Sequence, residues 1–319
     1  MKKIAIIGSG PTGIYTFYSL LTNAAPLSIT VFEKADQPGV GMPYSDEDNS
    51  RLMLANIASI EIPPIFITYL DWLKEQSDAH LARFKVDKTR LHDRQFLPRL
   101  LLGQYFRDSF LSIVTEAKRL GFNVDVHESA KVTDIIPATT GVTLSVNGSV
   151  LPEQFDLAVI ATGHVWPDED ESTRTFFPSP WSGLMDASIP PCRVGIMGTS
   201  LSGLDAAMAV VMQHGEFRDD KFVLDKGSDA LKIVLMSRTG ILPEADFYCP
   251  IPYEPLSVLT EGAAESEIAQ GSDGLLDRIF TLMVKELQLA DPTWCEKISL
   301  HKQNADSIRE AWFEDRKRH

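Results

Sequence analysis

Two glycine-rich motifs in this chain are of the type that binds the phosphates of a dinucleotide. The first, GSGPTG, covers residues 8–13, and the second, GTSLSG, covers residues 198–203. Each follows a short apolar run typical of a β-strand and precedes a run typical of an apolar helix. A glycine turn at a helix N-terminus presents backbone N–H groups and a positive dipole to phosphate oxygens. The two motifs therefore predict two dinucleotide sites.

The first motif has glycine at all three positions of the fingerprint. Residues 3–7 are predicted to form its strand, and residues 14–21 its helix. Gly8 would permit the tight turn, Gly10 would let a pyrophosphate approach the backbone, and Gly13 would let helix and strand pack closely. The other loop positions are also predicted cofactor contacts: Ser9, Pro11 and Thr12.

An acidic residue follows the next predicted strand. Residues 28–32 are apolar and β-branched, and Glu33 comes directly after them, 20 positions after Gly13. A carboxylate at this position would accept hydrogen bonds from the ribose hydroxyls of an adenosine. Lys34 follows and is included in the predicted site. The order of strand, helix, strand and acid favours an adenine-dinucleotide site over a plain turn.

The second motif has a serine in place of the middle glycine. Its strand is predicted over residues 193–197, and its helix follows in the range 204–211. A serine is still small enough to lie beside a pyrophosphate. The predicted contacts of this motif are Gly198, Ser200 and Gly203.

The strand after the second motif ends without an acid. Residues 232–236 are followed by Ser237 and Arg238. A carboxylate there would repel a 2′-phosphate, whereas a guanidinium can bind one through two hydrogen bonds. The second site is therefore predicted to prefer NADPH, with NADH the weaker ligand. The alternative is that Arg238 is an exposed loop cation.

The composition favours a soluble globular protein. The chain has 319 residues and a net charge of −14, and it contains no apolar run long enough to span a membrane. This acid excess disfavours nucleic acid or an anionic membrane as a partner, and the basic residues at 316–319 read as a solvated helix end. The N-terminus has no signal-peptide pattern. We expect a cytoplasmic protein that binds neither nucleic acid nor membrane.

The cysteines and histidines suggest no metal or dithiol chemistry. The three cysteines lie far apart at Cys192, Cys249 and Cys295, without a Cys-x-x-Cys pair. This spacing fits a reducing compartment and argues against a dithiol–disulfide reductase. The seven histidines are scattered, without ligand-like spacing. We predict no metal site.

A loop rich in Gly, Pro, Asn and Asp follows the Glu33 strand. It covers about residues 37–56. Loops at the carboxyl ends of parallel strands face the ligand crevice, so Gly41, Met42 and Asn56 are predicted to lie near the cofactor. An ordinary surface loop is the alternative.

Two helices are predicted next, over residues 69–76 and 96–120. The stretch that leads into the second helix, residues 91–96, combines a His, an Asp, an Arg and a Gln. Arg94 is a candidate ligand for a cofactor phosphate or carbonyl. Capping of the helix by Asp93 explains part of the same pattern.

A third region of small residues follows a strand predicted over residues 155–160. Small side chains at a strand end let the backbone pass close to a dinucleotide. A strand pair formed by residues 123–128 and 141–146 is predicted to precede it. The predicted cofactor contacts of this region are Ala161, Thr162, Gly163 and Val132.

Taken in this order, the motifs make the chain resemble bacterial FAD/NAD(P)-binding flavoproteins with two dinucleotide-binding domains, which are related to flavin-containing and N-hydroxylating monooxygenases. The resemblance rests on GSGPTG with Glu33, GVGMPYS at 39–45, HDRQFLPR at 92–99, FDLAVIATGH at 155–164 and GIMGTSLSGLDAA at 195–207. It implies that FAD lies along the first motif with its flavin toward the Gly41 loop. It also implies that NADPH lies along the second motif and Arg238.

The resemblance implies an α/β fold with two Rossmann-like domains and parallel sheets. Residues 1–188 would form the FAD-binding domain, with a helical insertion at about 60–120. Residues 189–319 would form the NAD(P)-binding domain and the C-terminal helices. No later strand and turn of the kind that closes the FAD domain follows. We therefore expect the N-terminal part of a longer protein or a shortened member of the group.

The predicted function is an FAD-dependent, NADPH-using, monooxygenase-like oxidoreductase that acts on an unidentified small molecule. The alternatives are an NAD(P)H:acceptor flavin reductase without oxygen insertion, and a non-catalytic FAD/NAD(P)-binding or sensing protein. No catalytic residue is assigned, and His164 could be structural or could transfer a proton. The irregular residues 243–253 could cap the nicotinamide or pack between domains. The sequence carries no signal for an oligomeric state.

Overall fold

The computed structural model describes residues 1–23, 25–45, 53–164, 172–184, 187–218, 221–243 and 255–316. The chain forms two compact units, Met1–Glu244 and Ala245–His319, which are described separately. The domain boundary predicted after residue 188 falls inside the first unit and stays a prediction. The irregular segment predicted over 243–253 lies, apart from its first residue, outside the described residues.

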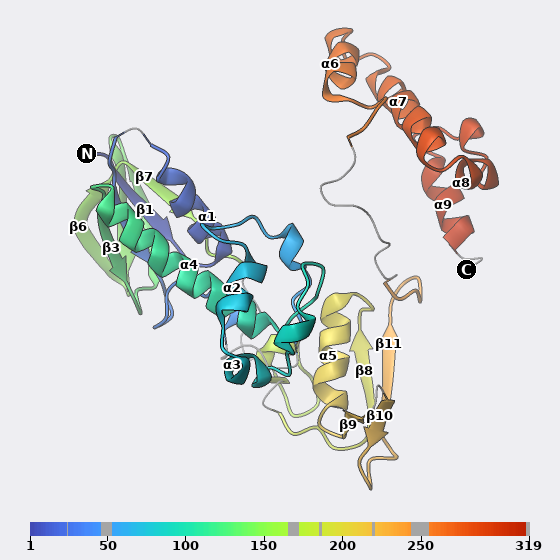
Figure 1. Cartoon of the computed structure of the whole chain (residues 1–319), viewed down its shortest axis with the longest axis horizontal. Helices are drawn as coiled ribbons and strands as arrows, with labels where there is room; N and C mark the ends of the chain where they lie inside the picture. Colours follow the sequence, from blue (N-terminus) through green and yellow to red (C-terminus); the bar gives the residue numbers. More distant parts are fainter. Residues whose placement is uncertain are drawn as a thin grey trace. The chain divides into compact units, whose positions relative to one another are not determined.

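Within the unit Met1–Glu244, the part that carries the first glycine motif, which we call the first motif's half, is built around a four-stranded parallel sheet (Figure 1). Its strands, in the spatial order β3–β2–β1–β7, are β3 (Asn123–His127), β2 (Ser28–Phe32), β1 (Lys3–Ile7) and β7 (Leu157–Ile160). Successive side chains point to opposite faces. Ile4 and Ile6 belong to one core cluster, and Ala5 and Ile7 to another. Both faces of β1 are therefore buried, as its continuous apolar run predicts.

Helices cover the face that carries Ile4 and Ile6. This layer contains α1 (Pro11–Leu20) and α4 (Arg99–Arg119), and the core cluster beneath them continues into α2 (Tyr69–Glu75) and α3 (Asp78–Ala82). Figure 1 shows α4 running beside the sheet. Phe17 of α1 and Phe110 of α4 are buried together in the core, with their rings 6.3 Å apart. The last three helices lie within the range predicted for the helical insertion.

The long helix begins three residues later than predicted. Pro98 is its N-cap, with φ −52° and ψ 135°. Proline disfavours the helical conformation in the residue before it, so the helix begins at Arg99 and not at residue 96. The expected capping by Asp93 is wrong, since Asp93 lies several residues before the helix and its carbonyl accepts the Ile60 N–H at 2.9 Å.

An antiparallel sheet covers the face that carries Ala5 and Ile7. It consists of β4 (Val132–Ala138), β5 (Gly141–Val146) and β6 (Ser149–Phe155), with β5 in the middle. Leu144 and Phe155 pack against the parallel sheet. The strand pair predicted between 123–128 and 141–146 is wrong, because β3 pairs with β2 while β5 pairs with β4 and β6.

The single strand predicted over 155–160 is also wrong. Residues 155–160 belong to two different strands, because β6 ends at Phe155 in the antiparallel sheet and β7 begins at Leu157 in the parallel sheet. Asp156 makes the transition between them. Its N–H donates to the Lys3 carbonyl at 2.8 Å, and its carboxylate accepts the Lys3 N–H at 2.7 Å. The hydrophobic pattern of residues 155–160 cannot predict this break, because it depends on a contact with Lys3, which is distant in the sequence.

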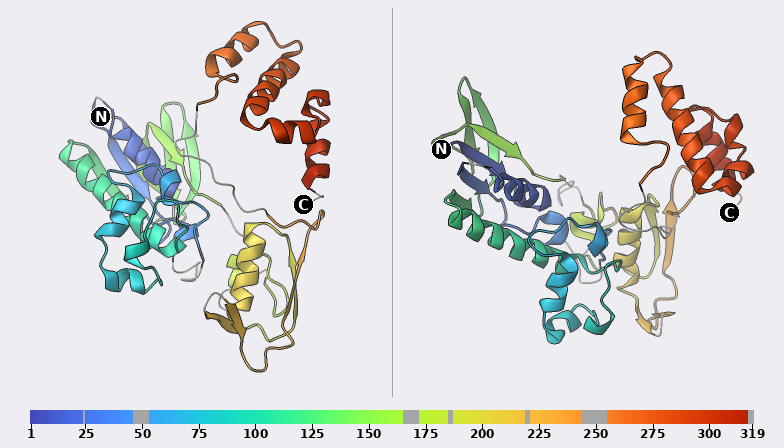
Figure 2. Two further views of the ribbon diagram at one scale, coloured as in Figure 1. Left: turned by 45° about the vertical axis from the view of Figure 1, so that its right-hand side comes forward. Right: turned by 45° about the horizontal axis from the view of Figure 1, so that its top comes forward.

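The second motif lies in a smaller βαβ arrangement of the same unit (Figure 2). β8 (Arg193–Met197) and β11 (Lys232–Met236) pair in parallel. The helix α5 (Leu201–Val211) packs on one face of this pair, where Ala206 and Val210 contact Val194 and Ile196. Between α5 and β11 the chain forms the hairpin β9 (Gly215–Arg218) and β10 (Lys221–Leu224). These elements confirm the predicted α/β fold with parallel sheets.

The unit Ala245–His319 is helical in its described part. It contains α6 (Glu261–Ala269), α7 (Leu275–Ala290), α8 (Pro292–Lys297) and α9 (Ile308–Arg316). Its core includes Cys295, Ile298 and Leu300. In the described parts of both units, short 3₁₀ helices cover Met42–Tyr44, Ser59–Glu61, Lys88–Arg90 and Leu300–Lys302, and a π-helical turn covers Pro180–Leu184.

Candidate functional site

The first glycine motif forms a tight turn between β1 and α1. Gly8 has φ +96°, in the region that favours glycine, and its N–H donates to the Phe32 carbonyl at 2.8 Å. A Cβ at Gly8 would lie 2.4 Å from the Ala161 carbonyl oxygen, and one at Gly13 would lie 2.1 Å from the Gly8 carbonyl oxygen. Neither position therefore admits a side chain, as the fingerprint requires.

The middle glycine faces a second loop. A Cβ at Gly10 would lie 3.3 Å from the Gly41 Cα, and a Cβ at Gly41 would lie 2.9 Å from the Gly10 Cα and from Pro11 Cδ. Gly10 is also the N-cap of α1 and provides no side-chain cap. The first N–H groups of the helix can therefore bind an anion such as a pyrophosphate.

Glu33 is buried at the end of β2 and is bonded to the motif. Its Oε2 accepts the Ser9 N–H at 2.9 Å and the Ser9 hydroxyl at 2.7 Å, while Oε1 accepts the Ala35 N–H at 3.0 Å. The Ser9 Oγ accepts the Gly39 N–H at 2.8 Å. The carboxylate therefore fixes the motif and the following loop together. Its remaining lone pairs are available to ribose hydroxyls.

A cavity of about 500 Å³ lies beside Glu33. Three further predicted residues line it: Lys34, Gly41 and Met42. Its other polar lining includes four residues that the sequence did not single out: Tyr44, Arg83, Gln104 and Arg107. Burial raises the pKa of the Tyr44 hydroxyl above its ordinary value, although the charge of Arg99 lowers it. Tyr44 is therefore a neutral donor, beside cations that suit a phosphate or a ribose.

Gly103 also lines this cavity and was not predicted, although it does leave a signal in the sequence. Gly103 lies inside α4, where glycine is a poor helix former. A Cβ at this position would lie 2.4 Å from the Tyr44 carbonyl oxygen. The glycine thus allows the loop after β2 to lie against α4, and an isolated glycine in a helical pattern often has such a packing reason.

The small residues after β7 also reach the first motif. The Ala161 N–H donates to the Ile7 carbonyl at 2.8 Å, and the Thr162 Cα would lie 3.4 Å from a Cβ at Gly8. Gly163 follows with φ +68°. The structure therefore brings this predicted region beside the predicted phosphate loop.

The structure gives the positions of three other predicted cofactor contacts. Val132 begins β4 two residues after Ala130, whose N–H donates to the Glu33 carbonyl at 2.7 Å. Asn56 is exposed, and Arg94 is half-buried in the stretch that leads to Pro98. Their roles at a cofactor stay predictions.

The second motif repeats the geometry of the first. The Gly198 N–H donates to the Met236 carbonyl at 2.7 Å, as Gly8 does to Phe32. Gly198 has φ +125°, and a Cβ at Gly203 would lie 2.6 Å from the Gly198 carbonyl oxygen. Ser200 is the N-cap of α5 and makes no side-chain capping bond. The first turn of α5 is therefore open to an anion, as in α1.

Arg238 lies in an exposed turn after β11. The Ser237 hydroxyl accepts the Gly240 N–H at 2.9 Å, and the Thr199 hydroxyl donates to the Ile241 carbonyl at 2.8 Å. These bonds hold the turn beside the second motif. Among the described residues, no acidic side chain forms an ion pair with Arg238. The guanidinium is thus accessible to a phosphate.

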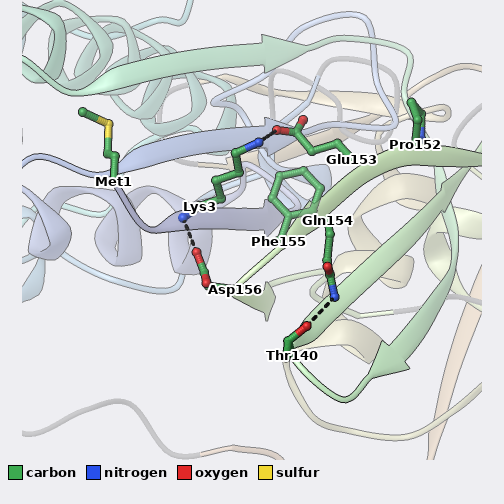
Figure 3. A pocket seen from close by; sticks show the side chains of 8 residues that line it. All are labelled: Met1, Lys3, Thr140, Pro152, Glu153, Gln154, Phe155 and Asp156. Atoms are coloured by element: carbon green, nitrogen blue, oxygen red, sulfur yellow. Dashed lines mark hydrogen bonds and ion pairs between the residues drawn. The ribbon is translucent and has the colours of Figure 1, made fainter.

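Another cavity lies at the opposite end of β1 (Figure 3). It has a volume of about 560 Å³, and its lining includes Met1, Lys3, Thr140 and the segment 152–156. The Lys3 ammonium is paired with Glu153 at 2.7 Å. Ligands of open α/β sheets bind at the carboxyl ends of the strands. A cavity at the beginning of β1 is therefore separate from both motifs.

No helix in the described ranges is long and apolar enough to cross a bilayer. Within the same ranges, no three His, Cys, Asp or Glu side chains are grouped to hold a metal ion.

The chain is similar to one curated protein over nearly its whole length. It is 63% identical over 322 residues to the uncharacterized protein YdhS of Escherichia coli (strain K12). The match covers 99% of this chain and 60% of the relative. This chain therefore spans about three fifths of the relative's length.

Two solved structures are distantly similar to this chain. The Kutzneria sp. 744 ornithine N-hydroxylase is 15% identical, with a TM-score of 0.48 and coverage of 87% of this chain and 62% of that one. The S-allyl-L-cysteine S-oxygenase from Allium sativum is 17% identical, with a TM-score of 0.45 and coverage of 79% and 54%.

Two family models match different parts of the chain. Residues 260–319 match the YdhS-like middle domain, and residues 5–165 match the FAD-NAD(P)-binding family. The second match includes the first glycine motif, Glu33 and the small residues after β7. It confirms the predicted resemblance and the predicted classes of cofactor, FAD and a nicotinamide dinucleotide. The chain belongs to the FAD-NAD(P)-binding family.

Proposed function

We propose that this chain is the nucleotide-binding part of an FAD-dependent, NADPH-using oxidoreductase that acts on a small molecule. The observation that carries the proposal is the repetition of one turn geometry at both motifs. In each motif the N–H of the first glycine donates to the carbonyl at the end of the neighbouring parallel strand. These bonds are Gly8 to Phe32 at 2.8 Å and Gly198 to Met236 at 2.7 Å. Two such turns in one compact unit support two nucleotides with different roles.

The first motif is assigned to FAD. Glu33 would bind the adenosine ribose, the N-terminus of α1 would bind the pyrophosphate, and the cavity beside Glu33 would receive the adenosine end. The second motif is assigned to the nicotinamide nucleotide, with Ser200 beside its pyrophosphate. Arg238 would bind the 2′-phosphate, which favours NADPH over NADH.

The bound nucleotides would supply the redox chemistry, which is hydride transfer from nicotinamide to flavin and electron transfer to oxygen or another acceptor. The chain's own contribution is to bind both nucleotides and to hold them in place. The oxygenase reaction is the favoured outcome. A flavin reductase without oxygen insertion and a non-catalytic sensor are the alternatives.

The test is a spectrum of the purified chain after reconstitution with FAD, followed by an anaerobic titration with NADPH. The proposal predicts a yellow protein whose flavin absorbance bleaches on addition of NADPH. A protein that retains no flavin contradicts the assignment of the first motif. A flavin that NADPH does not bleach favours the sensing alternative. Product analysis after readmission of air then separates the two enzymes: an oxygenase inserts oxygen into a substrate, whereas a reductase yields only hydrogen peroxide or a reduced acceptor.

A further inference from the structure

A shielded ion pair joins the two motif-bearing parts of the first unit. Arg99, the first residue of α4, donates from Nη2 to Asp205 Oδ2 at 2.9 Å. Asp205 lies on α5, two residues after Gly203. The two side chains are only 11% and 18% exposed, whereas those of the Lys3–Glu153 pair are 48% and 42% exposed. The interaction is therefore less screened by water than a surface pair.

Arg99 is itself held on several sides. Its Nε donates to the Leu54 carbonyl at 3.0 Å, and its backbone N–H donates to the Met53 carbonyl at 2.8 Å. Its guanidinium carbon lies 5.9 Å from the centre of the Trp181 ring, within the range of a cation–π contact. The planar guanidinium thus connects the loop before α4, the turn Pro180–Leu184 and the helix of the second motif. A lysine, with a single charged nitrogen, could not make all these contacts.

We propose that Arg99 and Asp205 are positioning residues that fix the second glycine motif relative to the first. The inference rests on the proposed function, because transfer between two bound nucleotides depends on their separation. Asp205 lies outside both glycine turns. Loss of the pair should therefore change the separation of the two sites and leave the contacts within each site in place.

The variant for this test is Asp205→Ala, because alanine preserves the helix propensity of α5. The matched control is Glu153→Ala, which removes an ion pair that lies wholly within the first motif's half. Both proteins are reconstituted with FAD. Three quantities are compared with the wild type: the affinities for FAD and NADP⁺, the single-turnover rate of flavin bleaching by NADPH, and amide hydrogen exchange.

We expect Asp205→Ala to keep both affinities close to those of the wild type. Its bleaching rate should fall by roughly ten- to a hundredfold, the scale on which a displacement of about 1 Å slows a positioned reaction. Amides in residues 53–58 and 201–211 should exchange faster together, while those of β1 and β2 should not change. The conservative variant Asp205→Glu, which keeps a carboxylate and leaves the other contacts of Arg99 in place, should recover part of the rate, and Glu153→Ala should change none of these quantities.

Two results would overturn the proposal. One is an Asp205→Ala protein whose bleaching rate and exchange equal those of the wild type. The other is a general rise in exchange with loss of both nucleotides and no recovery in Asp205→Glu, which is the result for a merely structural pair. If NADPH does not bleach the wild-type flavin, the proposed function fails, and the exchange comparison alone then decides whether the pair links the two elements.

Discussion

Glu33 and Ser9 make two hydrogen bonds to each other, although they lie 24 residues apart in the chain. The Ser9 N–H and hydroxyl both donate to Oε2 of Glu33, at 2.9 and 2.7 Å. The carboxylate that we assign to the ribose therefore also shapes the phosphate turn. The Ser9 hydroxyl extends the link to the Gly39 N–H, so one acidic residue organises three parts of the predicted FAD site.

The two hydrogen bonds between Ser9 and Glu33 lead to different predictions for a Ser9 variant and a Glu33 variant. Ser9→Ala removes the hydroxyl and leaves the Gly39 N–H without its acceptor, which should cost about 1–3 kcal/mol of unfolding free energy. It should still bind FAD, because the carboxylate remains. Glu33→Ala disturbs the same turn and also removes the ribose acceptor, so its FAD affinity should fall by about tenfold or more. Thermal unfolding and flavin titration measure the two effects, and normal FAD affinity in Glu33→Ala would refute the ribose assignment.

The middle glycine gives a second prediction. Gly10 has φ −70°, so alanine is compatible with the backbone, but its Cβ would lie 3.3 Å from the Gly41 Cα. Gly10→Ala should therefore push the two loops apart and weaken FAD retention, at a stability cost of about 1 kcal/mol. The control is Gly262→Ala in α6, where no atom lies within 4 Å of the new Cβ. Flavin content after gel filtration compares the two, and equal retention would mean that the Gly10 loop is only a turn.

Arg238 determines the choice of nicotinamide nucleotide in our assignment. A charge-assisted bond to a 2′-phosphate contributes on the order of 1.5–3 kcal/mol, or roughly ten- to a hundredfold in affinity. Arg238→Ala should lose that factor for NADPH and bind NADH as before. Lys232→Ala is the control, since Lys232 lies at the other end of β11. Calorimetric titrations decide, and equal losses for both nucleotides would show that Arg238 is structural.

Glu286 gives a prediction for the unit Ala245–His319. Its carboxylate accepts the N–H groups of Leu259, Ser257 and Val258, and these bonds lower its pKa to about 2. Because the folded-state pKa lies below the ordinary value of 4.5, the stabilisation is complete above pH 4.5 and is lost as the pH falls toward 2.

Glu286→Gln should therefore unfold this unit at lower temperature near neutral pH, and its midpoint should depend less on pH between 4.5 and 2. Circular dichroism of the full chain against temperature and pH measures both effects. Glu265→Gln, at an exposed position of α6, is the control. A Glu286→Gln protein that unfolds like the wild type at neutral pH would contradict the role of the carboxylate.

Local patterns predicted the central strands and both motifs well. β1, β2, β8 and β11 have the predicted bounds, because short β-branched runs bounded by glycine or charge leave few alternatives. The break at Asp156 was not predictable in this way, since it depends on hydrogen bonds to Lys3, 153 residues away. For the same reason Arg83 and Arg107 were missed: they reach the cavity beside Glu33 only through the packing of the helices.

The central claim is that one chain holds two nucleotides at separate sites. The most direct measurement is a calorimetric titration of the FAD-loaded protein with NADP⁺, with bound flavin followed by its absorbance. The account predicts one NADP⁺ per FAD-loaded chain, with the flavin retained throughout. Release of FAD in proportion to the NADP⁺ bound would mean that both nucleotides compete for one site, and it would contradict the account.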